Sequence, residues 1–180
     1  MAKMLGIKKK PASRLPLKTQ SFRRLKEMGV PVNTVIDVGV LSCTEALMHE
    51  YRDRLHVLVE PIEEFAPRIK EIYDKYGVRH DLVIAAASDR DGEVAMQTKS
   101  VMEGTAITHA RIVNEDAGGR KVKAMTLDTL VREGGYEGPF LLKIDVDGAE
   151  LEILKGARPV LDQCSVVCVE VDIKNIVQRA

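Results

Sequence analysis

The sequence contains no tryptophan, few aromatic residues and no apolar run near the ~20 residues that a membrane-spanning helix needs. No apolar stretch follows the basic N-terminus, so it does not have the pattern of a secretory signal. Only three cysteines are present, and the spacing of Cys43, Cys164 and Cys168 matches no zinc motif. We therefore expect reduced thiols, no metal site and a cytoplasmic protein.

The net charge is zero, but the charges are unevenly distributed. Residues 1–30 hold nine Lys or Arg and one acidic residue, so they carry +8 and residues 31–180 carry −8. Such a segment either contacts phosphate or anionic lipid or is a solubilising tail. Hardly any aromatic side chain lies among the basic ones to stack on bases, so no nucleic-acid partner is indicated. We predict a partly ordered basic segment over 1–30 and one domain over 31–180.

Short β-branched or apolar runs alternate with segments of helical periodicity along most of the chain. This alternation predicts an α/β fold with a mostly parallel sheet and helices on both faces. The predicted strands cover residues 34–38, 56–60, 82–88, 93–97, 121–125, 140–145 and 165–171. The predicted helices cover 44–54, 65–76, 127–133 and 149–156, and the polar stretch 98–120 is expected to be a long loop.

Several predicted strands end in residues that suit a nucleoside ligand, and in such sheets ligands bind at the carboxyl ends of the strands. Asp37 and Gly39 end the first strand, and Gly39 allows a close backbone approach. Glu60 ends the second strand, where a carboxylate can accept hydrogen bonds from both ribose hydroxyls. Ala86, Ala87 and Ser88 end the third and leave room for a flat adenine ring. As an alternative, each single carboxylate can instead cap the next helix.

NAD is one such nucleoside ligand, but the segment after the first strand does not favour it. A dinucleotide site prefers G-x-G-x-x-G, whereas "DVGVLSCTEA" has one glycine. Asp37 would repel phosphate and favour a cation, such as the amino group of S-adenosylmethionine.

The segment "LLKIDVDGAELEILKGA" (residues 141–157) ends a predicted strand with an unusual cluster of charges. With "VIDVG", "VLVEP", "AAASDRDGEV", "MTLDTL" and "VVCVEV" in the same order, the chain resembles the FkbM family of S-adenosylmethionine-dependent methyltransferases over about residues 30–171. The resemblance implies a Rossmann-like class I methyltransferase sheet. Such sheets usually continue through a further helix and a strand pair, so we expect either that the chain is a fragment or that its sheet edge is left short or covered by a partner. The strand 165–171 should therefore lie at or near a sheet edge. We expect this edge to pair with a second copy in a homodimer, to be covered by a chain terminus, or to make the protein poorly soluble if it stays bare.

The resemblance also implies roles for individual residues. Asp37 and Gly39 would lie near the methionine moiety of the cofactor, Glu60 at the ribose, and Ala86 to Ser88 near the adenine. Lys143, Asp145 and Asp147 would face the methyl acceptor. Two departures from the family pattern concern this site: Cys43 replaces a glycine, and Asp147 replaces a glutamate.

The charged cluster has a chemical interpretation beside the resemblance. If the strand geometry persists, Lys143, Asp145 and Asp147 share one face, and a buried Lys143 needs a carboxylate partner. Asp145 or Asp147 is the candidate base that takes the proton of a hydroxyl acceptor, with His109 as a lesser candidate. Glu150 falls in the first turn of the next helix and is expected to be structural.

These observations predict a methyltransferase that O-methylates a hydroxyl of a sugar or secondary metabolite. The alternative is a non-catalytic Rossmann-like binding module whose cofactor pocket is degraded at Cys43.

Overall fold

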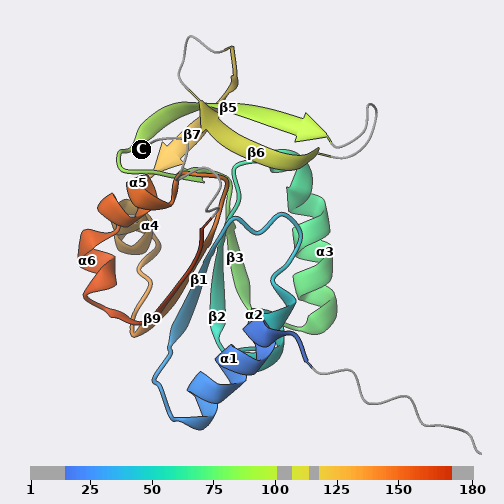
Figure 1. Cartoon of the computed structure of the whole chain (residues 1–180), viewed down its shortest axis with the longest axis vertical. Coiled ribbons are helices and arrows are strands. Elements are labelled where there is room, and N and C mark those ends of the chain that lie inside the picture. Colours follow the sequence, from blue (N-terminus) through green and yellow to red (C-terminus); the bar gives the residue numbers. More distant parts are fainter. Residues whose placement is uncertain (1–14, 101–106, 114–117, 172–180) are drawn as a thin grey trace, which may run out of the picture.

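The computed structural model describes residues 15–100, 107–113 and 118–171, which form two sheets with helices around the larger one (Figure 1). The larger sheet has five strands in the order β3-β2-β1-β8-β9, and every neighbouring pair is parallel. Its strands are β1 (Thr34–Val38), β2 (Leu55–Val59), β3 (His80–Val83), β8 (Phe140–Asp145) and β9 (Cys164–Glu170). The predicted Rossmann-like α/β arrangement is thereby confirmed.

Side-chain alternation in the central strands divides the core between two faces. Ile36 and Leu142 face one cluster, whereas Val35 and Leu141 face another. All four side chains are fully buried, and each such burial stabilises the fold by about 1.5–3 kcal/mol. Because both faces are covered, these strands are mostly apolar rather than alternating, with Asp37 and Lys143 as buried charged exceptions.

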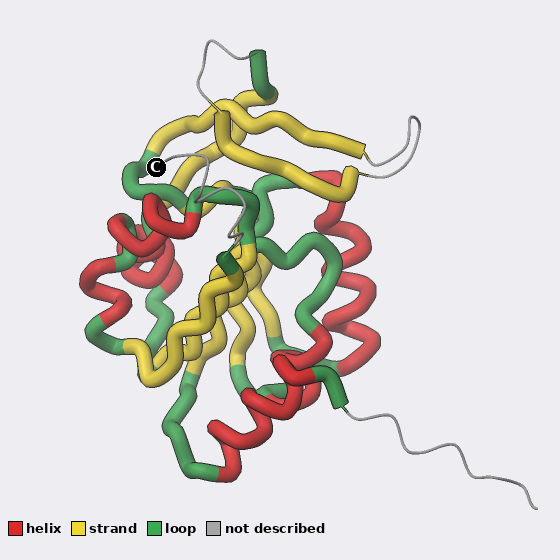
Figure 2. The backbone as a smooth tube through the Cα atoms, viewed as in Figure 1, coloured by secondary structure: helices red, strands yellow, loops and turns green. Residues whose placement is uncertain are grey.

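Helices cover both faces of the parallel sheet (Figures 1 and 2). The first face packs against α4 (Leu127–Gly134), α5 (Glu150–Lys155) and α6 (Arg158–Leu161). The other face packs against α1 (Leu17–Glu27), α2 (Glu45–Glu50) and α3 (Ala66–Tyr76), which the 3₁₀ turn η1 (Glu63–Phe65) precedes. Helix α3 ends at Gly77 in the left-handed conformation, as its sequence predicts.

Helix α1 lies within the segment that the sequence marks by its basic charge. Its Phe22 is 2% exposed and packs edge-on against Tyr51, with 6.3 Å between ring centroids. Arg23 forms a 2.8 Å ion pair with Glu50 of α2. Residues 17–27 are therefore docked on the parallel sheet through α2.

The smaller sheet corrects two sequence predictions. The predicted strand 82–88 is two strands, because β3 ends at Val83 and β4 (Ala86–Ala87) belongs to the second sheet. The predicted loop 98–120 contains β6 (Ile107–Val113), which pairs antiparallel with β5 (Gly92–Ser100). With β7 (Arg120–Met125), these strands form the order β4-β7-β5-β6. A continuous apolar run does not show where one strand ends and the next begins, and the sequence of β6 contains several polar residues, so neither feature had a clear signal.

In Figure 1 the second sheet lies across the end of the parallel sheet where strands β1, β2 and β3 finish. This position places it above the carboxyl ends of the strands, where ligands bind in such folds.

Strand β9 is the edge of the parallel sheet among the described strands, as predicted for residues 165–171. Its Val167 is 45% exposed. Pairing of this edge with a second copy stays a prediction. Among the helices of the described residues, none has both the length and the apolar character that crossing a bilayer requires.

Candidate functional site at the carboxyl ends of the parallel strands

A cavity of about 370 Å³ lies at the carboxyl ends of β1, β2 and β8. Its walls come from the segments that follow β1 and β2, from residues 85–87, from the end of β8 and the start of α5, and from one residue in each of the antiparallel strands β5 and β6. The sequence predicts nine cofactor and catalytic residues. The cavity wall brings together seven of them: Gly39, Glu60, Ala86, Ala87, Lys143, Asp145 and Asp147.

Asp37 and Ser88 lie outside the cavity wall, although the sequence placed both at the cofactor. Asp37 is fully buried beneath the wall, and Ser88 is 4% exposed. The backbone N–H of Ser88 donates to the Met125 carbonyl at 3.0 Å, which extends the pairing of β4 with β7. In this structure both residues support the site from behind.

Gly39 is required by the close approach of two strand ends, and it also lines the cavity. Its φ is +80°, and a Cβ there would lie 2.0 Å from the Asp145 carbonyl oxygen. Any side chain would therefore separate the end of β1 from the end of β8. The absence of a side chain at Gly39 thus lets the ends of β1 and β8 lie in contact beside the cavity.

The segment after Gly39 contains a tight turn centred on Leu41. Leu41 has φ of 55°, unusual for a residue with a Cβ, and the Ser42 N–H donates to the Val40 carbonyl at 2.6 Å. The Leu41 N–H donates to Glu60 Oε2 at 2.9 Å. A strained backbone conformation persists where surrounding contacts stabilise it, and here the hydrogen bond from Leu41 to Glu60 does so.

Glu60 is 4% exposed, and each of its carboxylate oxygens accepts one backbone N–H. Oε2 bonds to Leu41 and Oε1 bonds to Ile62, the latter at 3.0 Å. Burial raises the pKa of Glu60, although the backbone hydrogen bonds and the charge of Lys143 act in the opposite direction. An ionised carboxylate has about four acceptor positions, so Glu60 retains capacity for two hydroxyl donors.

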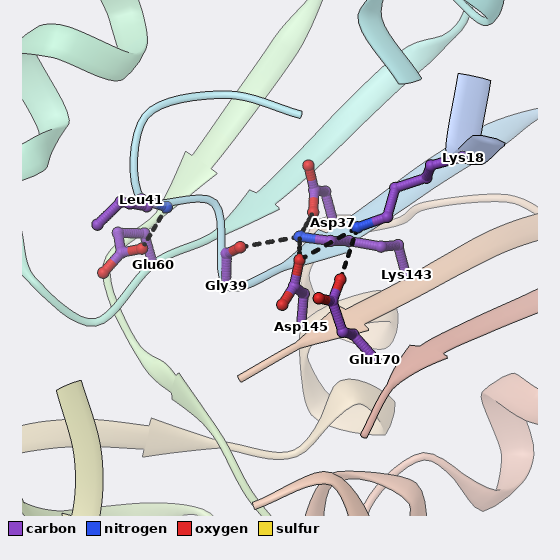
Figure 3. A network of polar contacts seen from close by, with 8 residues as sticks. All are labelled: Lys18, Asp37, Gly39, Leu41, Glu60, Lys143, Asp145 and Glu170. Carbon is purple, nitrogen blue, oxygen red and sulfur yellow. Dashed lines mark hydrogen bonds and ion pairs between the residues drawn. The ribbon is translucent and has the colours of Figure 1, made fainter. Parts of the chain in front are cut away.

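Lys143 is 3% exposed, and its ammonium lies at the junction of three oxygen atoms (Figure 3). Its Nζ is 2.9 Å from Asp37 Oδ1, donates to the Gly39 carbonyl at 2.9 Å, and is 3.4 Å from Asp145 Oδ2. The contact with Asp37 is an ion pair without hydrogen-bond alignment, and Asp37 Oδ2 has no partner among the described residues. The prediction that a buried Lys143 needs a carboxylate is confirmed.

Asp145 continues this chain of alternating charges toward the surface (Figure 3). Its Oδ2 is also 3.5 Å from Lys18 of α1, and Lys18 is 2.7 Å from Glu170 Oε2 at the end of β9. Partial burial lowers the pKa of Lys18, but the hydrogen bond to Glu170 and the charge of Asp145 raise it overall. Within the described residues Oδ1 of Asp145 has no hydrogen-bond partner, so it can accept a hydrogen bond or a proton from a ligand hydroxyl.

Sequence reasoning missed Lys18 and Glu170. Lys18 precedes Asp145 by 127 residues. No motif links the two, and Lys18 was counted only within the charge of the basic segment. The one available signal was strand parity. Asp145 shares the face of Leu141, and α1 covers that face.

Asp147 and Glu150 differ in their surroundings. Asp147 is exposed on the cavity wall just beyond the end of β8. Glu150 Oε1 accepts the Gly148 N–H at 3.1 Å, which stabilises the turn into α5. The structural role expected for Glu150 is confirmed. His109 lies on β6, and its side chain falls outside the described residues.

Cys43 lines the cavity, so a side chain occupies the position where the family pattern has glycine. The residue is half-buried, and this burial raises the pKa of its thiol. The cysteine is therefore a neutral, weakly polar part of the wall. Among the described residues no three His, Cys, Asp or Glu side chains form a group that could hold a metal ion.

Comparison with known proteins gives one family. The model described as "Methyltransferase FkbM domain" matches residues 29–176, which is most of the chain and includes every cavity residue. No curated protein and no solved structure gives a significant match. The matched range begins after α1, so Lys18 lies outside it.

Proposed function

The chain belongs to the FkbM methyltransferase family, and from this premise we propose that it methylates a hydroxyl group of a sugar or secondary metabolite with S-adenosylmethionine as methyl donor. The observation that carries the proposal is the buried carboxylate of Glu60 in the wall of the cavity at the strand ends. This carboxylate has acceptor capacity left after its two backbone hydrogen bonds.

The residues around the cavity fit the proposed cofactor. Glu60 would accept hydrogen bonds from the two ribose hydroxyls, because each of its oxygens has a remaining acceptor position. Ala86 and Ala87 are small and apolar and leave space for a purine ring. The carboxylates of Asp145 and Asp147 in the wall suit a cationic donor.

The same electrostatics disfavour a dinucleotide. Glu60, Asp145 and Asp147 line the cavity, and the one cation among its described lining residues, Lys143, is already paired with Asp37. A pyrophosphate there would therefore meet net negative charge. The helix after the first strand, α2, has only six residues and begins after a single glycine at position 39. This combination lacks the glycine-rich helix start that holds a pyrophosphate.

S-adenosylmethionine, when bound, supplies a methyl group made electrophilic by its sulfonium sulfur. In the transfer the C–S bond breaks, a C–O bond to the acceptor forms, and the hydroxyl proton must leave. Asp145 Oδ1 is the proposed proton acceptor, because Oδ2 is fixed by two ammonium groups and Oδ1 has no partner among the described residues. Fixing the acceptor in line with the donor can contribute up to ~7–11 kcal/mol.

Lys143 and Lys18 would act by holding Asp145. Lys143 is anchored from below by Asp37 and by the Gly39 carbonyl, and Lys18 is anchored by Glu170. The carboxylate of Asp145 is therefore held from both sides. Asp147, on the exposed side of the wall, is placed to bind a further hydroxyl of the acceptor.

Calorimetric titration with S-adenosylmethionine and, separately, with NAD tests the cofactor. Transfer of tritium-labelled methyl groups to a panel of sugars and hydroxylated aromatic metabolites tests the reaction, with Asp145→Asn as the catalytically impaired control. Binding of S-adenosylmethionine and labelling of a hydroxyl support the proposal. Binding of NAD alone contradicts it, and binding of neither ligand favours the non-catalytic binding module.

A further inference from the structure

The antiparallel strands β5 and β6 of the smaller sheet contribute two apolar side chains to the cavity, Met96 of β5 and Ile112 of β6. They come from a region that the sequence suggested was partly loop. They are also direct cross-strand partners, so their side chains lie next to each other on one face of the sheet. That face is directed at the cavity and at Ala86.

We propose that this antiparallel sheet is a wall of the cofactor site, and that Met96 and Ile112 contact bound S-adenosylmethionine. The inference rests on the proposed function and extends the cofactor site to the antiparallel strands β5 and β6. It assigns the two side chains to cofactor affinity rather than to packing of the sheet alone.

Packing connects these side chains to the small residues at the predicted adenine position. Met96 is 5% exposed and shares one buried cluster with Ala86, against which Ile112 also packs. Ala86 itself lines the cavity. A ligand ring that lies against Ala86 is therefore within reach of Met96, whose flexible thioether suits contact with an aromatic ring.

The antiparallel sheet is also attached to the segment that follows Glu60. Arg120 of β7 is the cross-strand partner of Met96, and its guanidinium pairs with Glu64 of η1. The next residue, Phe65, lines the cavity. The sheet is thus connected on one side through β4 and on the other through this ion pair, which keeps Met96 above the cavity.

Val94 offers a matched control for Met96. It lies two residues away on the same strand and therefore on the same face, it is 7% exposed, and it belongs to the same buried cluster. It does not line the cavity. Trimming either residue to alanine removes packing from one cluster, but only trimming Met96 removes a ligand contact.

The test is calorimetric titration of S-adenosylhomocysteine into the full chain and its Met96→Ala, Ile112→Ala and Val94→Ala variants, with melting curves beside each. We expect Met96→Ala and Ile112→Ala to weaken binding roughly tenfold, which is about 1.4 kcal/mol, and Val94→Ala to leave it unchanged. Ile112 is only half-buried, so its variant serves if Met96→Ala does not fold.

Two results overturn the inference while leaving the proposed function intact. One is unchanged affinity in the Met96 and Ile112 variants, and the other is an equal loss in the Val94 variant. A parent protein that does not bind S-adenosylhomocysteine at all contradicts the proposed cofactor itself and the inference with it.

Discussion

Asp37 of β1 and Lys143 of β8 are Cα partners in the parallel ladder, and their charged groups lie 2.9 Å apart in the interior. Asp37 is 0% exposed and Lys143 is 3% exposed. The pair therefore links the two central strands, β1 and β8, just below the charged residues that line the cavity. A carboxylate at this depth serves as the counter-ion of Lys143, and its place near the methionine moiety of the cofactor stays a prediction.

Replacing Lys143 by methionine should destabilise the protein strongly. The substitution leaves Asp37 as a buried carboxylate without a counter-ion, which typically costs about 3–5 kcal/mol. Urea unfolding followed by circular dichroism measures the loss. The double variant Asp37→Asn with Lys143→Met should recover part of it, because no buried charge remains. A Lys143→Met protein as stable as the parent would mean that Asp37 reaches water or another partner.

Glu60→Gln should weaken S-adenosylhomocysteine binding and remove a pH dependence. The charge-assisted hydrogen bonds to the ribose are each worth about 1.5–3 kcal/mol. Burial raises the pKa of Glu60 above 4.5, so the ionised form is lost at higher pH than in an exposed carboxyl. Parent affinity should therefore fall as the pH decreases through that raised pKa, and the variant should lack this step. Calorimetry at several pH values measures both effects.

The same raised pKa has the opposite consequence for the free protein. The folded state holds the Glu60 proton more tightly than the unfolded state does. The contribution of Glu60 to stability is therefore present at low pH and declines as the pH rises through the interval between the ordinary and the raised pKa.

A ligand-binding profile identical in parent and Glu60→Gln would show that Glu60 only holds the Leu41 turn.

Cys43→Gly should preserve or improve affinity for S-adenosylhomocysteine. The thiol is neutral and lines the cavity, so its removal gives the ligand more space and takes away no charge. Calorimetry on the variant and the parent makes the comparison. A tenfold loss of affinity, about 1.4 kcal/mol, would show that the cysteine contacts the ligand favourably.

Asp145→Asn should reduce turnover by about 10²–10⁴-fold, as expected for a lost proton acceptor. Affinity for S-adenosylhomocysteine should change little, because Glu60 and the apolar wall hold the cofactor. Asp147→Asn is the matched control, with the same chemical change two residues away on the exposed part of the wall. If Asp147→Asn abolishes labelling and Asp145→Asn does not, the two roles are exchanged.

Much of the parallel sheet follows from the sequence because its central strands β1, β2 and β8 are buried on both faces. The runs at 34–38 and 140–145 are short, apolar and bounded by turn residues, and both coincide with their strands. The antiparallel sheet was less readable. Ala86 and Ala87 pair with a different sheet from the residues just before them, and tertiary pairing rather than local propensity decides this.

The site was predictable to a similar extent. Residues that end parallel strands meet at one edge by geometry, so Glu60 and Asp145 were found from their order along the chain. Lys143 was found from the charged cluster around it and from the family resemblance. Lys18, Met96 and Ile112 come from elements whose packing no local pattern specifies. The depth of Asp37 was also hidden, because a carboxylate at the end of a strand can face either a cavity or a neighbouring strand.

The most direct test of the account is a crystal structure of the protein soaked with S-adenosylhomocysteine. The account predicts the ligand in the cavity at the strand ends, with both ribose hydroxyls within hydrogen-bond distance of the Glu60 carboxylate. It further predicts the purine against Ala86 and Met96, and the sulfur directed toward Asp145. A cavity that stays empty at saturating ligand, or a ligand whose ribose does not contact Glu60, would contradict it.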